Sequence, residues 1–255
     1  MEIPGIGKIN RRAGKWGRCF ARQGLILMYH RIHESAPDPW SLCVSPHYFA
    51  EHIEVLKSLV SILSLSSLCR ALRDVNLPDG GVAITFDDGY ADNLHTAAPI
   101  LERHAVPATV FVATGQPGSK REFWWDELER LLLRLGVLPE TLCLTINGAD
   151  YRWQLGPAAV YSDEDLHRDS HRQAWEGDQG SRLHLYHSIW ELLLPLPQQA
   201  QREALDQLLD WASQDSVVRS SHRSLSTEEI CTLTRGNLIQ VGAHTITHPF
   251  LSAHS

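Results

Sequence analysis

Two polar segments, far apart along the chain, carry side chains that could bind a metal ion and move protons. Residues 85–90 read Thr-Phe-Asp-Asp-Gly-Tyr, and residues 244–249 read His-Thr-Ile-Thr-His-Pro. Two histidines four positions apart can face one ion, and a carboxylate can complete a set of three ligands that leaves room for water. Each segment alone is also compatible with a helix cap, a surface turn or ordinary polar histidines, so the pair indicates a candidate site.

Both segments follow short apolar runs of the kind that form strands buried on both faces. Five such runs are present, at residues 25–30, 61–66, 82–88, 108–114 and 238–244. Helical patterns lie between them, and Ser45-Pro46 and Ser226 have the spacing of helix N-caps. This alternation predicts an α/β fold with a parallel sheet, in which sites form at the carboxyl ends of the strands.

The candidate side chains all lie at predicted strand ends. Adjacent residues of a strand point to opposite faces, so Asp87 and Asp88 can serve one site only where the chain bends, and Gly89 permits that bend. Tyr29-His30 ends the first predicted strand and should lie on the same edge. A lone histidine at a strand end is more often structural, so a functional role for His30 is expected only if the metal site exists.

The composition excludes several classes of protein. The chain has 255 residues, a formal net charge of −7 and 43% hydrophobic residues, which fits a soluble globular protein and not a nucleic-acid binder. Its five cysteines are scattered without a Cys-x-x-Cys pair, so neither a disulfide framework nor a thiolate zinc site is expected. No apolar run is long enough for a transmembrane helix. Residues 1–24 are basic, lack a signal-peptide core and are expected to form a leader.

The alternation of strands and helices stops at residues 119–222, which are expected to form a mainly helical insertion. Helical spacing from Trp125 to Leu135 ends at Gly136, a β-hairpin is predicted around Asn147-Gly148, and helical patterns return near residues 183–194 and 201–212. Six of the eight tryptophans fall in this stretch. They could form the core of a small subdomain, the more frequent case, or stack on sugar rings.

The two polar segments together, in this order and each behind a strand, resemble the polysaccharide deacetylase family, also called the NodB-homology domain or carbohydrate esterase family 4. The resemblance covers about residues 25–118 and 223–255. It implies a distorted (β/α) barrel in which Asp87 is the catalytic base. It also implies that Asp88, His244 and His248 are metal ligands and that Thr245 braces the ligand loop.

The sequence departs from the family in two respects. Family members usually carry their catalytic-acid histidine in a late Leu-x-x-His motif, which this chain lacks. Permuted poly-N-acetylglucosamine deacetylases carry it early in a Tyr-His context, so the resemblance assigns the acid to His30, supported by Tyr29. The chain also stops soon after Pro249, before the family's groove-forming motif. An incomplete barrel and a C-terminally truncated domain are therefore expected.

The resemblance implies hydrolysis of N-acetyl groups on a glycan, with release of acetate. The expected cofactor is a divalent metal, Zn²⁺ first with Co²⁺ or Ni²⁺ as alternatives, and the expected partner is the glycan. Without a signal peptide, a cytoplasmic or membrane-peripheral location is expected. Two His and one carboxylate also form the facial triad of non-haem iron oxygenases, and a non-catalytic fragment that holds metal and binds glycan is the other alternative.

Overall fold

The computed structural model describes residues 23–74, 76–78 and 80–253, so the leader predicted at residues 1–24 lies almost wholly outside the described part. The chain forms two compact units. Described residues 23–34, 43–113 and 225–244 form the first, and residues 35–42, 114–224 and 245–253 form the second. The units differ from the predicted segments because residues 35–42 and 245–253 group with the second. The predicted division into a deacetylase domain and an insertion stays a prediction.

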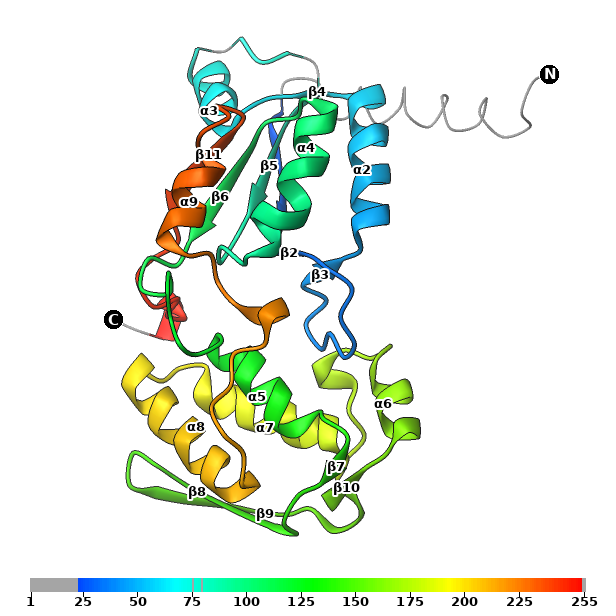
Figure 1. Ribbon diagram of the computed structural model, residues 1–255, viewed down its shortest axis with the longest axis vertical. Coiled ribbons are helices and arrows are strands. Elements are labelled where there is room, and N and C mark those ends of the chain that lie inside the picture. The colour runs from blue at the N-terminus through cyan, green and yellow to red at the C-terminus, as the bar shows by residue number, and fades with distance from the viewer. Residues whose placement is uncertain (1–22, 75, 79, 254–255) are drawn as a thin grey trace, which may run out of the picture. The chain divides into compact units, whose positions relative to one another are not determined.

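The first unit is built on a parallel sheet of strand order β1-β5-β6-β11 (Figure 1). Its strands are β1 (Leu25–Tyr29), β5 (Gly81–Phe86), β6 (Ala108–Val112) and β11 (Ile239–Ala243). A short strand, β4 (Ser61–Ile62), pairs in parallel with the start of β5. All six residues of β5 are buried, as expected for a central strand of a parallel sheet covered on both faces.

Helices cover this sheet and close its core. They are α2 (Pro46–Leu59), α3 (Leu65–Arg73), the π-helical turn η1 (Asn93–Ala97), α4 (Ala98–His104) and α9 (Thr227–Leu233). Helices α2 and α4 pack against each other (Figure 1), and the core between helices and sheet includes Phe49, Ile84 and Leu101. After β1 come two strands of two residues each, β2 (Arg31–Ile32) and β3 (Cys43–Val44), which pair with each other in parallel.

Local chemistry sets the helix starts in this unit. The Ser45 hydroxyl accepts a hydrogen bond from the Tyr48 N–H, with Pro46 at the first helical position, and Ser226 forms a capping box with Glu229. Both predicted caps are confirmed. The strand predicted at 61–66 is wrong beyond Ile62, because the Ser64 side chain caps α3 and turns the chain into a helix.

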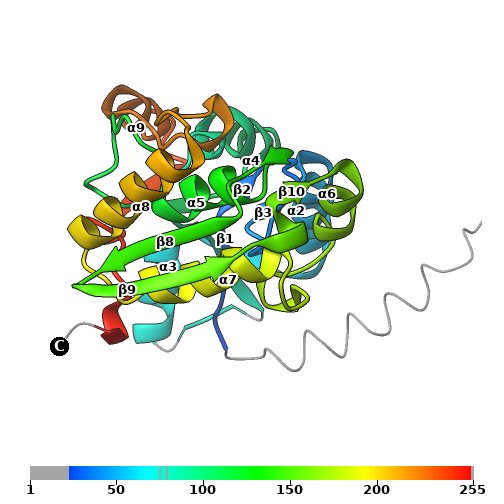
Figure 2. The same ribbon diagram turned by 90° about the horizontal axis from the view of Figure 1, so that it is seen from below.

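The second unit combines helices with short antiparallel strand pairs. Its elements are α5 (Trp124–Leu132), β7 (Gly136–Val137), β8 (Thr141–Ile146), β9 (Ala149–Gln154), η2 (Gly156–Ala159), β10 (Val160–Tyr161), α6 (Asp163–Asp169), η3 (Ala174–Glu176), α7 (Arg182–Leu193), α8 (Gln198–Ala212), η4 (Ser220–His222) and η5 (Leu251–Ala253). The hairpin of β8 and β9 (Figure 2) confirms the Asn147-Gly148 turn, where both residues have positive φ. Helix α5 ends at Leu132, so the predicted stop at Gly136 is wrong; Gly136 belongs to β7.

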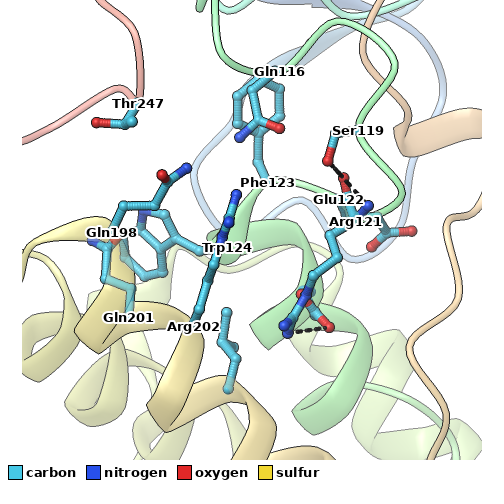
Figure 3. A pocket seen from close by; sticks show the side chains of 12 residues that line it. Gln116, Ser119, Arg121, Glu122, Phe123, Trp124, Gln198, Gln201, Arg202 and Thr247 are labelled. Carbon is cyan, nitrogen blue, oxygen red and sulfur yellow. Dashed lines mark hydrogen bonds and ion pairs between the residues drawn. The ribbon is translucent and has the colours of Figure 1, made fainter.

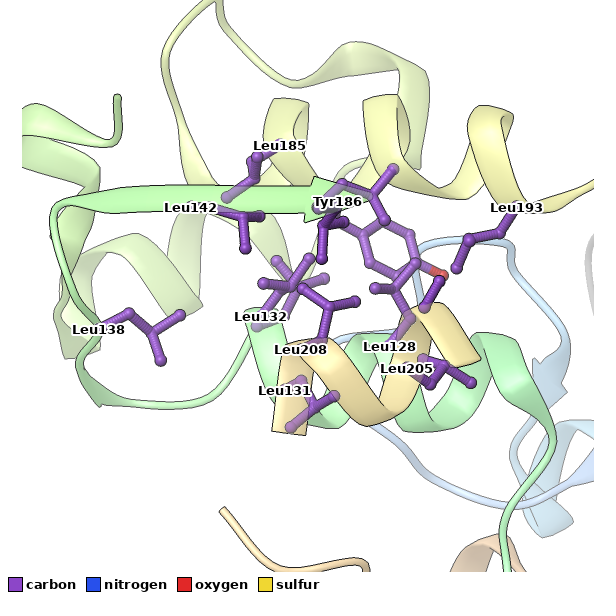
Figure 4. Close-up of a cluster of buried hydrophobic side chains, with 14 of the residues drawn as sticks. Leu128, Leu131, Leu132, Leu138, Leu142, Leu185, Tyr186, Leu193, Leu205 and Leu208 are labelled. Carbon is purple, nitrogen blue, oxygen red and sulfur yellow. The ribbon is translucent and has the colours of Figure 1, made fainter. Parts of the chain in front are cut away.

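Leucine side chains dominate the core of the second unit. Leu128 and Leu132 of α5 meet Tyr186 of α7 and Leu208 of α8 beneath the hairpin (Figure 4). Arg182 is also buried there, 2% exposed. Its guanidinium donates to the carbonyls of Leu132, Ala158 and Ala159, which fixes the ends of two helical segments against α7.

The predicted α/β class with a parallel sheet is confirmed, whereas the barrel stays a prediction. Five of the described strands of the first unit form one sheet, and β2 and β3 form a separate pair. Among the helices of residues 23–253 that the structure describes, none is both long and apolar enough to cross a bilayer.

Gly89 should be the least replaceable glycine of the sheet edge. Its φ is +79°, and an added Cβ would lie 3.0 Å from Val112 Cγ2. We expect Gly89→Ala to lower the free energy of unfolding by about 3 kcal/mol, from backbone strain plus the clash. Urea denaturation measures the loss. Gly118→Ala is the matched control, because Gly118 has φ +75° with nothing within 4 Å. Equal losses in the two variants would contradict a contribution from Val112.

Candidate metal centre

Parallel strand pairing brings the candidate residues of the first unit to one edge of the sheet. Tyr29 is opposite Phe86 in the β1–β5 register, and the Asp87 N–H donates to the Tyr29 carbonyl across 2.9 Å. On the other side, Ala243 is opposite Val112, and the His244 N–H donates to the Val112 carbonyl across 2.8 Å. The residues that follow β1, β5 and β11 therefore leave the sheet at the same edge.

A left-handed turn then orients the two aspartates. Asp88 has φ +70° and Gly89 has φ +79°, so two successive residues depart from the strand conformation. Backbone hydrogen bonds hold the turn, since the Ala113 N–H donates to the Asp88 carbonyl and the Leu225 N–H to the Gly89 carbonyl. A positive φ at an aspartate costs free energy, and such strain is concentrated at functional sites.

His244 lies against both carboxylates. Its Nε2 is 3.7 Å from Asp88 Oδ1 and 3.9 Å from Asp87 Oδ2. The Asp88 side chain is 2% exposed, whereas the side chains of Asp87 and His244 are 15% and 31% exposed. Asp88 is thus at the back of the group, and Asp87 and His244 remain open to solvent.

The electrostatic environment of Asp88 is unusual for a carboxyl group. Burial raises the pKa of Asp88 to about 6, from an ordinary value of 3.8. Positive charge on His30 and His244 acts in the opposite direction, and the negative charge of Asp87 raises the pKa further. A buried carboxylate of this kind is stabilised by a nearby cation, which is the physical reason to expect metal binding here.

The four-residue loop after His244 places His248. Thr245 and His248 both have positive φ, and the Thr245 hydroxyl accepts a hydrogen bond from the His248 N–H at 3.0 Å, the kind of contact that its predicted bracing role requires. One potential ligand atom each from Asp88, His244 and His248 lies within 4.8 Å of the others. One carboxylate oxygen and two imidazole nitrogens are a donor set that suits a divalent transition metal. The residues therefore fit the implied metal.

His30 follows β1 and lies close enough to Asp88 for its charge to influence the aspartate. Its carbonyl accepts a hydrogen bond from Asn93 Nδ2 at 2.9 Å. Tyr29 differs, because its ring packs on Phe49 and Phe86 in the core, where burial raises the pKa of its hydroxyl. Tyr29 therefore reaches the candidate centre through its backbone carbonyl.

Sequence reasoning missed three positioning residues near His30. Asp92 accepts hydrogen bonds from Arg31 Nε at 3.2 Å and from the Ile32 N–H at 3.1 Å, and the Arg31 guanidinium lies 4.6 Å from the centre of the Tyr90 ring. With Asn93, these contacts tie the end of β1 to the segment after the two aspartates. A charged residue directly after a strand-end histidine was the available signal.

The comparisons with known proteins find similarity to polysaccharide deacetylases. Residues 74–134 match the family model described as polysaccharide deacetylase. The matched segment contains Asp87 and Asp88, so the chain is similar to this family where the two aspartates lie. Over 108 residues it is 29% identical to YxkH of Bacillus subtilis (strain 168), a protein named as a polysaccharide deacetylase, with 42% of this chain aligned. The chain spans 37% of the length of that relative.

Two solved structures show weaker similarity to this chain. IcaB from Ammonifex degensii is 27% identical with a TM-score of 0.36, over 42% of this chain and 47% of that one. The Streptococcus pyogenes deacetylase PplD, in complex with acetate, is 21% identical with a TM-score of 0.33, over 75% of this chain and 70% of that one. Both TM-scores are low, so the similarity to polysaccharide deacetylases rests on the sequence matches.

The ionised carboxylate of Asp88 should destabilise the folded, metal-free protein at pH values above the pKa of Asp88. The pKa of Asp88 is raised in the folded state, so folding takes up a proton between pH 3.8 and about 6, and the free energy of unfolding falls as the pH rises through that window. With EDTA at pH 8, we expect Asp88→Asn to raise the free energy of unfolding by about 2 kcal/mol, a gain that disappears near pH 4.

Denaturant titration at several pH values measures this effect. Asp215→Asn, at an exposed aspartate of the second unit, is the control and should leave the free energy of unfolding unchanged. A pH-independent gain in Asp88→Asn would show that the carboxylate's burial is not its cause.

Proposed function

We propose that this chain removes N-acetyl groups from a glycan by metal-dependent hydrolysis, releasing acetate. The observation that carries the proposal is the buried Asp88 carboxylate beside His244, with the loop that places His248 next to them and the more exposed Asp87 at the same edge. The sequence similarity supports the same reaction, because the matched family and the matched relative are both named for polysaccharide deacetylation.

In this proposal Asp88, His244 and His248 hold the metal. Bound there, a Zn²⁺ ion would supply Lewis-acid polarisation of the amide carbonyl and acidify water; Co²⁺ and Ni²⁺ fit the same donors. Ligand sets of one carboxylate and two imidazoles leave coordination positions for water and for substrate. Asp88 is the buried ligand of this set, and the two histidines are partly exposed to solvent.

Asp87 is the proposed general base. It follows a strand as Asp88 does, yet it is more exposed and lies 3.9 Å from His244 Nε2, so it can approach a water molecule without being a ligand. A carboxylate beside a cation stays ionised at neutral pH, which is the state that accepts a proton. Its backbone N–H is fixed to the Tyr29 carbonyl, which limits the movement of the carboxylate.

His30 is the proposed general acid. An amine is a poor leaving group unless its nitrogen receives a proton as the carbon–nitrogen bond breaks. His30 leaves β1 beside Asp87 in the sheet, because Tyr29 pairs with Phe86. It can thus donate a proton on one side of the amide while Asp87 accepts one from water on the other. The hydrogen bond of Asn93 to its carbonyl holds the backbone in place.

Removing the base should separate metal binding from turnover. We expect Asp87→Asn to lower the rate of acetate release from N-acetylglucosamine oligomers about 10²- to 10⁴-fold, the usual contribution of a general base, while zinc content stays the same. The Asp88→Asn variant should lose both the bound zinc and the release of acetate. Acetate assays and elemental analysis measure the two properties. A fully active Asp87→Asn variant would refute the assignment of the base.

Removing the acid should matter only when the leaving group needs a proton. We expect His30→Ala to lower kcat/KM for the N-acetyl sugar about 10²-fold or more, and to affect p-nitrophenyl acetate far less, since nitrophenolate leaves without protonation. His47→Ala is the matched control, because His47 is exposed on α2. Equal losses on both substrates would assign His30 a structural role.

A further inference from the structure

The second unit contains a small hollow whose wall includes Thr247, the neighbour of the proposed ligand His248 (Figure 3). Trp124, Gln116, Gln198 and Arg202 also line it. The enclosed space is about 20 Å³, enough for one small polar group and not for a whole sugar ring. A ligand would therefore lie across the mouth and insert a single substituent.

Several polar side chains that line the hollow already form hydrogen bonds or ion pairs within the protein. Arg121 donates to Glu127 at 2.9 and 3.0 Å and forms an ion pair with Asp206 at 2.6 Å. Gln201 Nε2 donates to the Leu193 carbonyl at 3.1 Å, and Glu122 accepts hydrogen bonds from Arg219. These residues build a rigid rim and have little hydrogen-bonding capacity left for a ligand.

The other polar side chains that line the hollow can still form hydrogen bonds with a ligand. Among the residues that the structure describes, no hydrogen bond or ion pair involves the side chains of Gln116, Gln198, Arg202 and Thr247. Gln116 is 8% exposed as a whole residue, and its carboxamide makes no hydrogen bond to another described residue. A carboxamide can both donate and accept hydrogen bonds, so Gln116 can bind a polar group placed in the hollow. This arrangement indicates a place for a polar ligand group.

An indole borders these unsatisfied groups. Trp124 is partly exposed and is held by aromatic contacts, with ring centres 5.6 Å from Trp125 and 5.9 Å from Trp190. Trp125 in turn lies edge to face on the His248 ring, at 4.9 Å. The hollow therefore lies close to the proposed metal ligand His248. Thr247 of its lining precedes His248 in the chain, and Trp125, the neighbour of Trp124, contacts the His248 ring.

We propose that this hollow is a subsite for a second sugar of the glycan, other than the sugar that loses its acetyl group. A pyranose offers a face of C–H bonds to the Trp124 indole, and hydroxyl or acetamido groups to the amides and the guanidinium. An apolar face flanked by donors and acceptors is what such a ring requires. The proposal rests on the proposed function, and it predicts a preference for oligomers over the monosaccharide.

Binding and turnover together test the subsite. In the Asp87→Asn background, which binds without turnover, calorimetry with N-acetylglucosamine and its tetramer gives both affinities. We expect the tetramer to bind at least tenfold more tightly, and Gln198→Ala and Gln116→Met each to weaken tetramer binding about three- to tenfold. Binding of the monosaccharide should not change.

Gln199→Ala is the matched control, because Gln199 is the next residue of α8, does not line the hollow and pairs with Glu203. It should bind the tetramer as the parent does. Tetramer binding that is unchanged in both hollow variants, with normal acetate release by the parent enzyme, would overturn the subsite alone. Absence of both glycan binding and acetate release in the unmutated chain would overturn the proposed function and the subsite with it.

Discussion

The burial of one carboxylate, that of Asp88, is the constraint on which the candidate site depends. An ionised carboxylate with 2% of its side chain exposed is costly unless positive charge compensates it. The charges of His30 and His244 supply part of this compensation, and a bound cation would supply more. The fold thus favours a metal at this site, because without one the burial of the carboxylate raises the pKa of Asp88 to about 6.

Backbone strain is the second requirement of this arrangement. A straight continuation of β5 would direct Asp87 and Asp88 to opposite faces of the sheet. The left-handed conformations of Asp88 and Gly89 break that alternation, and backbone hydrogen bonds from neighbouring segments hold the strained turn. The loop from Thr245 to His248 uses positive φ in the same way. Both segments of the candidate centre therefore depend on left-handed backbone conformations.

The sequence predicted the parallel sheet and the strand-end residues because both follow from local patterns. Buried strands need consecutive apolar residues, and caps such as Ser45 act within one turn. Longer-range effects were not predictable. The strand predicted at 61–66 stops at Ile62 because Ser64 caps a helix, and Asp92 reaches Arg31 only after folding. Ionic and amide contacts between distant residues leave no periodic signal in a sequence.

The tryptophans of the second unit show why a single interpretation of a residue type fails. Trp125 is buried, as a core residue should be, yet its ring contacts His248. Trp124, one position earlier, is partly exposed and lines the hollow together with Gln116, Gln198 and Arg202. On a helix, adjacent residues point about 100° apart, so one side chain can pack while the next faces solvent. The core interpretation and the sugar-stacking interpretation are therefore compatible, because α5 presents one indole for each.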